Sequence, residues 1–129
     1  MSIYTEFIET IESEALRTVC NALHDEILLY PNTVVKKKFS LPFFYGNTWV
    51  CYLNLVKKKG SADKEIELCF VRGRELPSKE LLDFKERVMI GGLSYSTIKA
   101  IDWGVLKLLL EEAIHLDQER PYTFTKKKK

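Results

Sequence analysis

The chain has 129 residues, of which 46% are apolar, and this is the size of one globular domain with a single core. Its net charge of +2, from 20 basic and 18 acidic residues, is too small to predict a nucleic-acid or membrane partner from bulk electrostatics. The three cysteines lie far apart, with no C-x-x-C spacing that would suggest a zinc site or a redox pair, and they are expected to be small buried apolar groups.

Residues 3–30 are predicted to be helical, in two pieces. Apolar and acidic residues fall on opposite arcs of the first piece, and an apolar stripe with spacings of three and four continues through the second. The stripe of the second piece consists of Leu16, Val19, Cys20, Leu23, Ile27 and Tyr30. Pro31 and Asn32 then end the helix. Because the acidic N-terminal segment is no secretory signal and no long apolar run follows, the protein is expected to be cytoplasmic.

The apolar period changes to two over the next segment, which predicts a β-hairpin. One strand, residues 36–45, and a second, residues 48–56, are joined by Gly46-Asn47, a two-residue turn that accepts positive φ angles. This turn fixes a register in which Tyr45 pairs with Thr48.

Pro42 then decides where the first strand lies in the sheet. In the predicted register its missing N–H points away from the second strand. A proline at such a position is tolerated only where no further strand pairs. The first strand is therefore predicted to be an edge strand.

The remaining elements complete a two-layer fold. A strand over residues 65–71 is predicted to pair antiparallel with the second strand, and a short helix over 78–84 follows. Alternation places Ile66, Leu68 and Phe70 on one face of this strand and Glu65, Glu67 and Cys69 on the other, more polar face. A fourth strand, residues 87–95, contains Gly91-Gly92, which indicates a bulge or a close backbone approach. The last helix begins after Asp102, a good N-cap, and its apolar stripe is expected to be buried. That stripe consists of Leu106, Leu109, Leu110, Ala113 and Ile114.

The fold class predicted from these elements is α+β. We expect an antiparallel four- to five-stranded sheet with the N-terminal helices and the C-terminal helix packed mainly on one face. Residues 1–118 are expected to form one domain, and residues 119–129 a disordered basic tail.

The order of these segments resembles that of a known family. The matching runs are LPFFYGNTWVCYLNLVKK, ELCFVRGREL, LLDFKERVMIGGLSYSTI and EEAIHLDQE, and they lie within about residues 14–118. They resemble the YdhG-like family, which is defined as a domain of unknown function. The resemblance implies a compact α+β fold and no particular reaction. One branch of that family has been linked to frataxin-like iron handling, so the resemblance also implies iron binding or an iron-chaperone role.

An acidic face on the first helix supplies the candidate iron ligands, which are Glu6, Glu9 and Glu12. Iron ions prefer oxygen ligands, and exposed carboxylates one helical turn apart can bind them weakly. The alternative is that glutamates near a helix N-terminus stabilise the helix dipole and solvate its outer face. That alternative is favoured, because any amphipathic surface helix needs a solvated charged face.

The aromatic hairpin supplies a second candidate site. One predicted face carries Pro42, Phe44, Trp49, Cys51, Leu53 and Leu55, and the other carries Phe39, Leu41, Phe43, Tyr45, Val50 and Tyr52. Both faces are apolar, but a two-layer fold buries only one of them. The other must be covered by a loop, a partner chain or a ligand, and loop cover or a homodimer contact is favoured over a small-molecule pocket. The candidate ligand-binding residues are Phe43, Tyr45, Trp49, Tyr52, Asn54 and Arg72.

Two lysine triplets supply a third candidate site. In the predicted register Lys36 lies opposite Lys57, so the triplets meet at the open end of the hairpin and could hold phosphate or a nucleic-acid backbone. The six residues are Lys36, Lys37, Lys38, Lys57, Lys58 and Lys59. Protection of an edge strand against aggregation is the favoured interpretation, and a nucleic-acid partner is not expected.

No catalytic constellation is evident in the sequence. Cys20 and His24 lie four residues apart on one helix face, but Cys20 belongs to the apolar stripe, and buried structural cysteines are inert. Walker, Rossmann and HExxH patterns are absent. Arg87 is expected to form a structural ion pair. The sequence therefore predicts a binding or accessory domain, with iron as the candidate cofactor.

Overall fold

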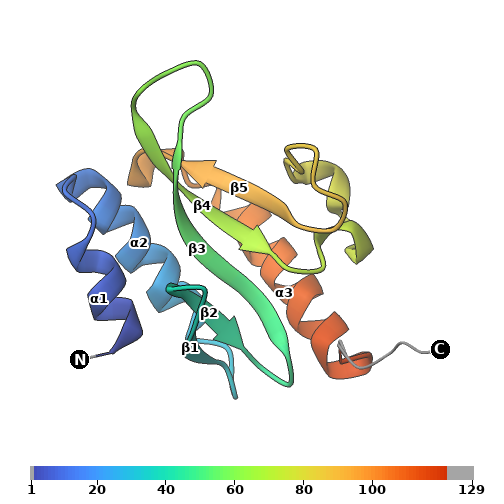
Figure 1. Cartoon of the computed structure of the whole chain (residues 1–129). Coiled ribbons are helices and arrows are strands. Elements are labelled where there is room, and N and C mark those ends of the chain that lie inside the picture. The colour runs from blue at the N-terminus through green and yellow to red at the C-terminus, as the bar shows by residue number, and fades with distance from the viewer. Residues whose placement is uncertain (1, 122–129) are drawn as a thin grey trace.

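The computed structural model describes residues 2–121, which contain three α-helices and five β-strands. They are α1 (Ile3–Glu9), α2 (Glu14–Ile27), β1 (Val34–Lys38), β2 (Leu41–Tyr45), β3 (Trp49–Lys57), β4 (Lys64–Phe70), β5 (Gly91–Tyr95) and α3 (Trp103–Glu119). Short 3-10 helices lie at Gly73–Glu75, Lys79–Leu81 and Ile98–Ala100. The strands form one antiparallel sheet in the order β1-β2-β3-β4-β5, so each strand pairs with its neighbours along the chain (Figure 1).

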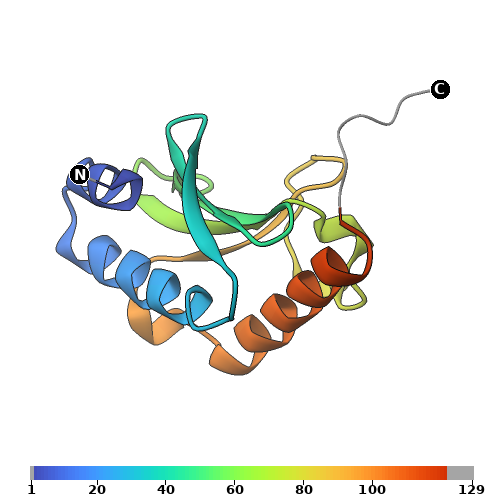
Figure 2. The ribbon, with the colours of Figure 1, turned by 90° about the horizontal axis from the view of Figure 1, so that it is seen from below.

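The molecule has two layers. Helices α2 and α3 lie on one face of the sheet, and Figure 2 shows that neither of them covers the opposite face. The core fills the space between these helices and the sheet, with fully buried side chains from both layers. This confirms the predicted α+β fold. We call the face of the sheet that is turned away from α2 and α3 the open face.

Each of the three helices begins directly after a residue that caps it. The side chains of Ser2, Ser13 and Asp102 each accept a hydrogen bond from a backbone N–H three residues further on. The buried residues of α2 are Leu16, Val19, Cys20, Leu23 and Ile27, and those of α3 are Leu106, Leu109, Leu110, Ala113 and Asp117. The predicted division of the N-terminal segment into two helices, the Asp102 cap and most of both stripes are confirmed.

The segment predicted as one strand, residues 36–45, is a hairpin of two strands. Its turn residues are Phe39 and Ser40, which have φ angles of 53° and 62°. Lys38 pairs with Leu41 across this turn. Positive φ at both central residues is the signature of a primed turn, for which Asn-Gly is the usual sequence. Phe-Ser gives no such signal, so the sequence did not reveal the turn.

The prediction of an edge position for Pro42 is consequently wrong. β2 lies between β1 and β3, and β1 is the edge strand. Pro42 pairs with Lys37 of β1, and the ladder between β2 and β3 ends at the neighbouring Phe43. The proline is accommodated in an inner strand because it lies where one of the two ladders ends.

The predicted register of the turn between β2 and β3 is also wrong. Tyr45 pairs with Trp49, not with Thr48, and the register shifts by one residue beside this pair. The cause lies in α3, where the Asp117 carboxylate accepts hydrogen bonds from the N–H groups of Asn47 and Thr48 at 2.7 and 2.8 Å. It also accepts a bond from the Thr48 hydroxyl at 2.6 Å. A residue about 70 positions away therefore holds the turn in a wider form than its own sequence predicts.

The second half of the sheet follows the prediction more closely. β4 pairs antiparallel with β3 as expected, whereas β5 is confined to the last five residues of the predicted strand. The predicted helix over residues 78–84 is only the 3-10 turn Lys79–Leu81. The close approach expected at the glycine pair is confirmed, because a Cβ atom on Gly92 would overlap the Glu67 carboxylate.

No helix within residues 2–121 is long and apolar enough to cross a lipid bilayer. The predicted basic tail lies outside the described residues from position 122 onward.

Candidate binding surface

Five aromatic rings meet on the open face of the sheet. The ring of Phe43 stacks on that of Tyr52, with 4.4 Å between centroids and 20° between planes. The edge of Trp49 contacts Phe43 at 5.5 Å, and Tyr45 contacts Trp49 at 4.8 Å. The rings of Phe39 and Phe43 meet edge to face, with 6.3 Å between their centroids. We call these five residues the aromatic cluster.

Strand geometry explains how the cluster forms. Phe43 and Tyr52 are paired across β2 and β3, and directly opposed residues share a face. Trp49 was predicted on the same face as Phe44, but the register shift turns it to the open face, while Val50 joins the core. That predicted assignment of Trp49 and Val50 to opposite faces is therefore reversed.

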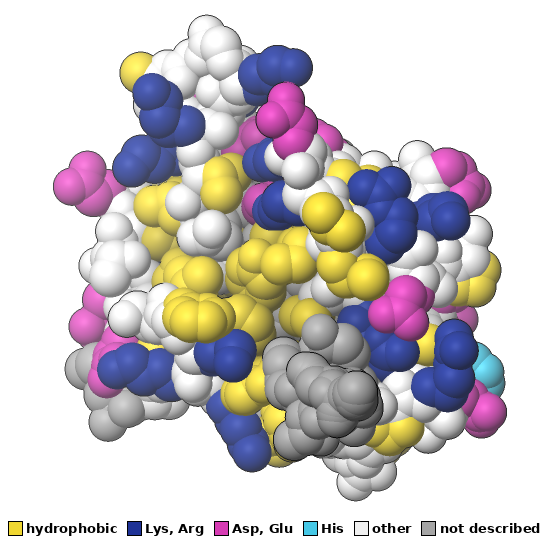
Figure 3. All heavy atoms as spheres, turned by 45° about the vertical axis from the view of Figure 1, so that its right-hand side comes forward, with side chains coloured by type: hydrophobic (Ala, Val, Ile, Leu, Met, Phe, Trp, Pro, Cys, Tyr) yellow, Lys and Arg dark blue, Asp and Glu magenta, His cyan; other side chains and the backbone are white. Residues whose placement is uncertain are grey.

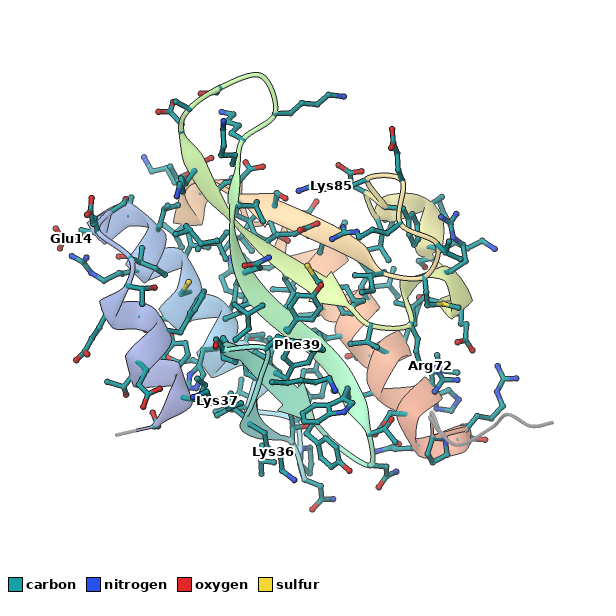
Figure 4. All side chains as sticks on the ribbon, in the orientation of Figure 1. Glu14, Lys36, Lys37, Phe39, Arg72 and Lys85 are labelled. Carbon is teal, nitrogen blue, oxygen red and sulfur yellow. The ribbon has the colours of Figure 1, made fainter. Side chains whose placement is uncertain are left out.

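The rings differ in how far they are covered. Phe43 is only 5% exposed, because its neighbours in the cluster surround it. Phe39 is 79% exposed at the tip of the β1–β2 turn, and Figure 4 shows its ring at the front of the sheet. The cluster thus has a buried centre at Phe43 and one mostly exposed ring at Phe39.

Two lysines of β1 place their charges over the cluster. The Lys36 ammonium lies 4.2 Å from the centroid of the Tyr45 ring. The Lys38 ammonium lies 5.0 Å from the Phe39 centroid and 5.1 Å from that of Trp49. All three distances fall within the range of cation–π attraction. Figure 3 shows hydrophobic side chains gathered over this part of the molecule, with lysine and arginine side chains around them.

The predicted meeting of the two lysine triplets is wrong. Lys36 pairs with Phe43 of β2, whereas Lys57 pairs with Lys64 of β4. The first triplet belongs to β1, near which Figure 4 labels Lys36 and Lys37, and the second begins the β3–β4 loop at the opposite end of the sheet. The error follows from the missed β1–β2 turn. Because of this turn, the first triplet pairs with β2 and does not reach Lys57.

The three candidate iron ligands are not gathered into one site. Helix α1 ends at Glu9, so Glu12 lies beyond the helix on which the spacing argument depends. Glu6 lines a cavity of about 360 Å³ together with Lys37, and Glu12 lines another of about 650 Å³ together with Lys58. Within residues 2–121 no group of three or more His, Cys, Asp or Glu side chains is arranged to hold a metal ion. Iron binding by these glutamates stays a prediction.

Two of the predicted ligand-binding residues do not belong to the aromatic cluster. Asn54 lines the same cavity as Lys37. Arg72 lies beside α3, where two of its N–H groups bond to the carboxylate of Glu75 and a third bonds to the carbonyl of Arg120 (Figure 4). The hydrogen bonds from Arg72 hold the pKa of Glu75 below its usual range. The structure therefore brings together four of the six predicted residues.

A buried ion pair lies on the open face, and the sequence predicted only one of its two partners. Arg87 was expected to form a structural ion pair, and its guanidinium lies 2.7 Å from the Glu67 carboxylate. Glu67 is 1% exposed, and a second cation, Lys85, lies 3.5 Å away. Period-two alternation placed Glu67 on the polar face of its strand, but gave no sign that the segment around Lys85 folds over it.

Cys69 connects this ion pair to the aromatic cluster. It pairs with Tyr52 across β3 and β4, and its sulfur lies 3.9 Å from a guanidinium nitrogen of Arg87. Burial raises the pKa of the Cys69 thiol to about 12 and also raises the pKa of the Tyr52 hydroxyl. Both groups are therefore neutral around neutral pH.

The cysteines are buried and free, as the sequence predicted. Burial raises the pKa of the Cys20 thiol to about 12, and the ring of His24 stacks on Tyr4 at 3.8 Å. Because the thiolate is the reactive form, we expect no thiol of the native protein to react with Ellman's reagent at mildly alkaline pH, and all three to react in denaturant. Prompt reaction of even one thiol in the native protein would contradict this expectation.

The comparisons with known proteins give no relatives: no family model, no curated protein and no solved structure matches this chain. The resemblance to the YdhG-like family thus stays a prediction. The open face can therefore bind a partner by non-covalent contact, through its flat apolar rings and the positive charges that lie over them.

Proposed function

We propose that this chain is a binding module that captures an extended anionic partner on the open face of its sheet. The observation that carries the proposal is Phe39, a bulky aromatic residue held at positive φ with most of its ring in solvent. Such a conformation costs a non-glycine residue on the order of 1 kcal/mol or more. Phe39 lies outside the core cluster, so burial in the core does not offset this cost. Strained residues of this kind gather at sites of recognition.

The charge of the surface supports an anionic partner. Lys36 and Lys38 hold their ammonium groups over the aromatic cluster. Farther along the open face, Lys85 and Arg87 more than balance the single carboxylate of Glu67. Complementary charge raises the rate of association and selects among partners.

The same charge argues against a symmetric homodimer through this face. A two-fold interface places the same patch of both copies in contact. Two patches that both carry positive charge would then face each other, and like charges in an interface are destabilising. An extended partner is favoured over a small molecule, because the rings of the cluster pack against one another along a sheet face.

Trp49 allows a direct test by fluorescence. In a Trp103→Phe background it is the sole tryptophan, since the chain has two. We expect its emission to change at low salt when either of two anionic probes is added, a short oligothymidylate or a short peptide of alternating Glu and Phe. A peptide of alternating Lys and Phe should leave it unchanged.

A matched pair of double variants controls for net charge. Lys36→Ala/Lys38→Ala removes the two lysines over the rings, and Lys58→Ala/Lys59→Ala removes two exposed lysines of the distant β3–β4 loop. We expect the first pair to weaken binding by roughly 10-fold and the second by less than about 2-fold. Equal effects of the two pairs, or no response of Trp49 to either anionic probe, would overturn the proposal.

A further inference from the structure

We propose that the partner of the open face is single-stranded nucleic acid, whose bases stack on Phe39 and whose phosphates bind Lys36 and Lys38. This inference rests on the proposed function, because it names the chemical class that the same surface recognises. It differs from the sequence-based expectation, in which the lysines met at another place and nucleic acid was not expected.

Phe39 has the geometry of a stacking platform. Among residues 2–121 its ring contacts that of Phe43, at 63° between planes and 6.3 Å between centroids, and the Phe39 side chain is still 79% exposed. The residue is also the most exposed aromatic side chain of the cluster. Every nucleobase has a flat π-face, so an exposed aromatic ring can stack on any base without reading sequence.

The ammonium groups of Lys36 and Lys38 can exchange their contacts with the rings for contacts with phosphate groups. They are alternate residues of β1, so they project from the same face of the strand, and Lys36 lies directly across from Phe43. Each ammonium now rests over rings at 4.2 to 5.1 Å. A cation–π contact at an exposed site is weaker than a charge-assisted hydrogen bond to a phosphate oxygen. A strand whose base lies on Phe39 would therefore attract both ammonium groups to its backbone.

An extended peptide fits this surface less well. Peptides that bind sheets add as a further strand at an edge, where their backbone finds unpaired N–H and C=O groups. Four rings of the aromatic cluster lie on β2 and β3, which are inner strands with neighbours on both sides. Their face offers side-chain contact alone. That is the mode in which sheet faces bind single-stranded RNA, through bases stacked on aromatic side chains.

Duplex nucleic acid is excluded by the same geometry. Bases within a duplex are stacked on one another and present only their edges in the grooves. Within residues 2–121 the open face presents aromatic rings, whereas the two long helices, α2 and α3, lie on the other side of the sheet (Figure 2). Binding to Phe39 therefore requires unpaired bases.

The test uses the full chain in the Trp103→Phe background and measures the affinity for four probes. These are an oligothymidylate, an abasic strand of the same length, a duplex of the same length and the Glu-Phe peptide. We expect the oligothymidylate to bind at least about 10-fold more tightly than the abasic strand or the duplex. With two phosphate contacts, the logarithm of its affinity should fall with the logarithm of salt concentration with a slope of about −1.4. Lys36→Ala/Lys38→Ala should bring this slope close to zero.

Phe39→Asn separates binding from folding. Asparagine tolerates positive φ better than phenylalanine does, so this variant should fold with unchanged or higher stability. We expect it to lose about 5- to 100-fold in affinity for oligothymidylate, with little change for the abasic strand. Phe39→Tyr keeps the ring and should retain most of the affinity.

The outcomes distinguish the two proposals. If the Glu-Phe peptide binds in a manner that depends on the two lysines, and oligothymidylate binds no better than the abasic strand, the nucleic-acid inference is overturned and the binding function stands. If no anionic probe binds, both proposals fail. Unchanged oligothymidylate affinity in a folded Phe39→Asn variant also overturns the inference.

Discussion

Replacing Arg87 with alanine should lower the free energy of unfolding by about 3–5 kcal/mol, because it leaves the Glu67 carboxylate buried without its main counter-charge. The loss is this large because Glu67 is almost fully removed from water, and the remaining cation, Lys85, is farther away at 3.5 Å. Arg87 also donates to the carbonyls of Asp83 and Phe84, so its removal detaches the turn that covers the carboxylate. Urea denaturation of the variant and the parent protein measures the difference.

A second arginine of the same region serves as control. Arg74 donates to the carbonyls of Val88 and Arg87 and stacks on Phe84, but it has no described carboxylate partner. Arg74→Ala should cost less than about 1 kcal/mol. A similar small loss in Arg87→Ala would show that Lys85 alone balances the buried charge.

A double variant tests whether burial of the charge is the cause. Glu67→Leu/Arg87→Leu removes both charges and keeps apolar volume over β4 and β5. We expect it to recover most of the stability lost in Arg87→Ala, because an apolar pair needs no desolvated counter-charge. A double variant as unstable as Arg87→Ala would assign the loss to the backbone hydrogen bonds of Arg87 instead.

The helical layer was predictable because its signals are local. The predicted capping residue Asp102 acts within one turn of the helix that it begins. The apolar stripes recur at the helical period, and the residue types on them are those that pack a core. Neither signal depends on how the rest of the chain folds, so the structure contains both features as predicted.

The turns of the sheet were not predictable because their conformations are set by contacts or strain outside local preference. The β1–β2 turn uses Phe39 and Ser40 at positive φ, where their residue types are disfavoured. The β2–β3 turn has the expected glycine and asparagine, but Asp117 binds it from α3. A single wrong turn changes every pair beyond it, and this is why the predicted lysine cluster failed with the register.

The sequence predicted which residues form the candidate site better than it predicted how they are arranged. Phe43, Tyr45 and Tyr52 were correctly assigned to one face, because period-two alternation holds within each strand. Trp49 was correctly named as a ligand-binding candidate but assigned to the opposite face, because alternation cannot reveal a bulge. The importance of Phe39 became evident only with its φ angle and exposure, neither of which the sequence contains.

We expect Asp117→Ala to lower the free energy of unfolding by about 2–4 kcal/mol, since the buried carboxylate accepts three hydrogen bonds from the β2–β3 turn. Without it, the N–H groups of Asn47 and Thr48 lose their partners, and the turn loses the contact that determines its bulged register. The near-ultraviolet circular dichroism of the aromatic cluster should change as well, because Trp49 follows this turn directly. Glu119→Ala removes an exposed carboxylate of the same helix and should cost less than about 0.5 kcal/mol. If Asp117→Ala were as mild as Glu119→Ala and left the aromatic signal intact, the turn would hold its register without α3, and the bulge that carries Trp49 to the open face would have to be encoded locally.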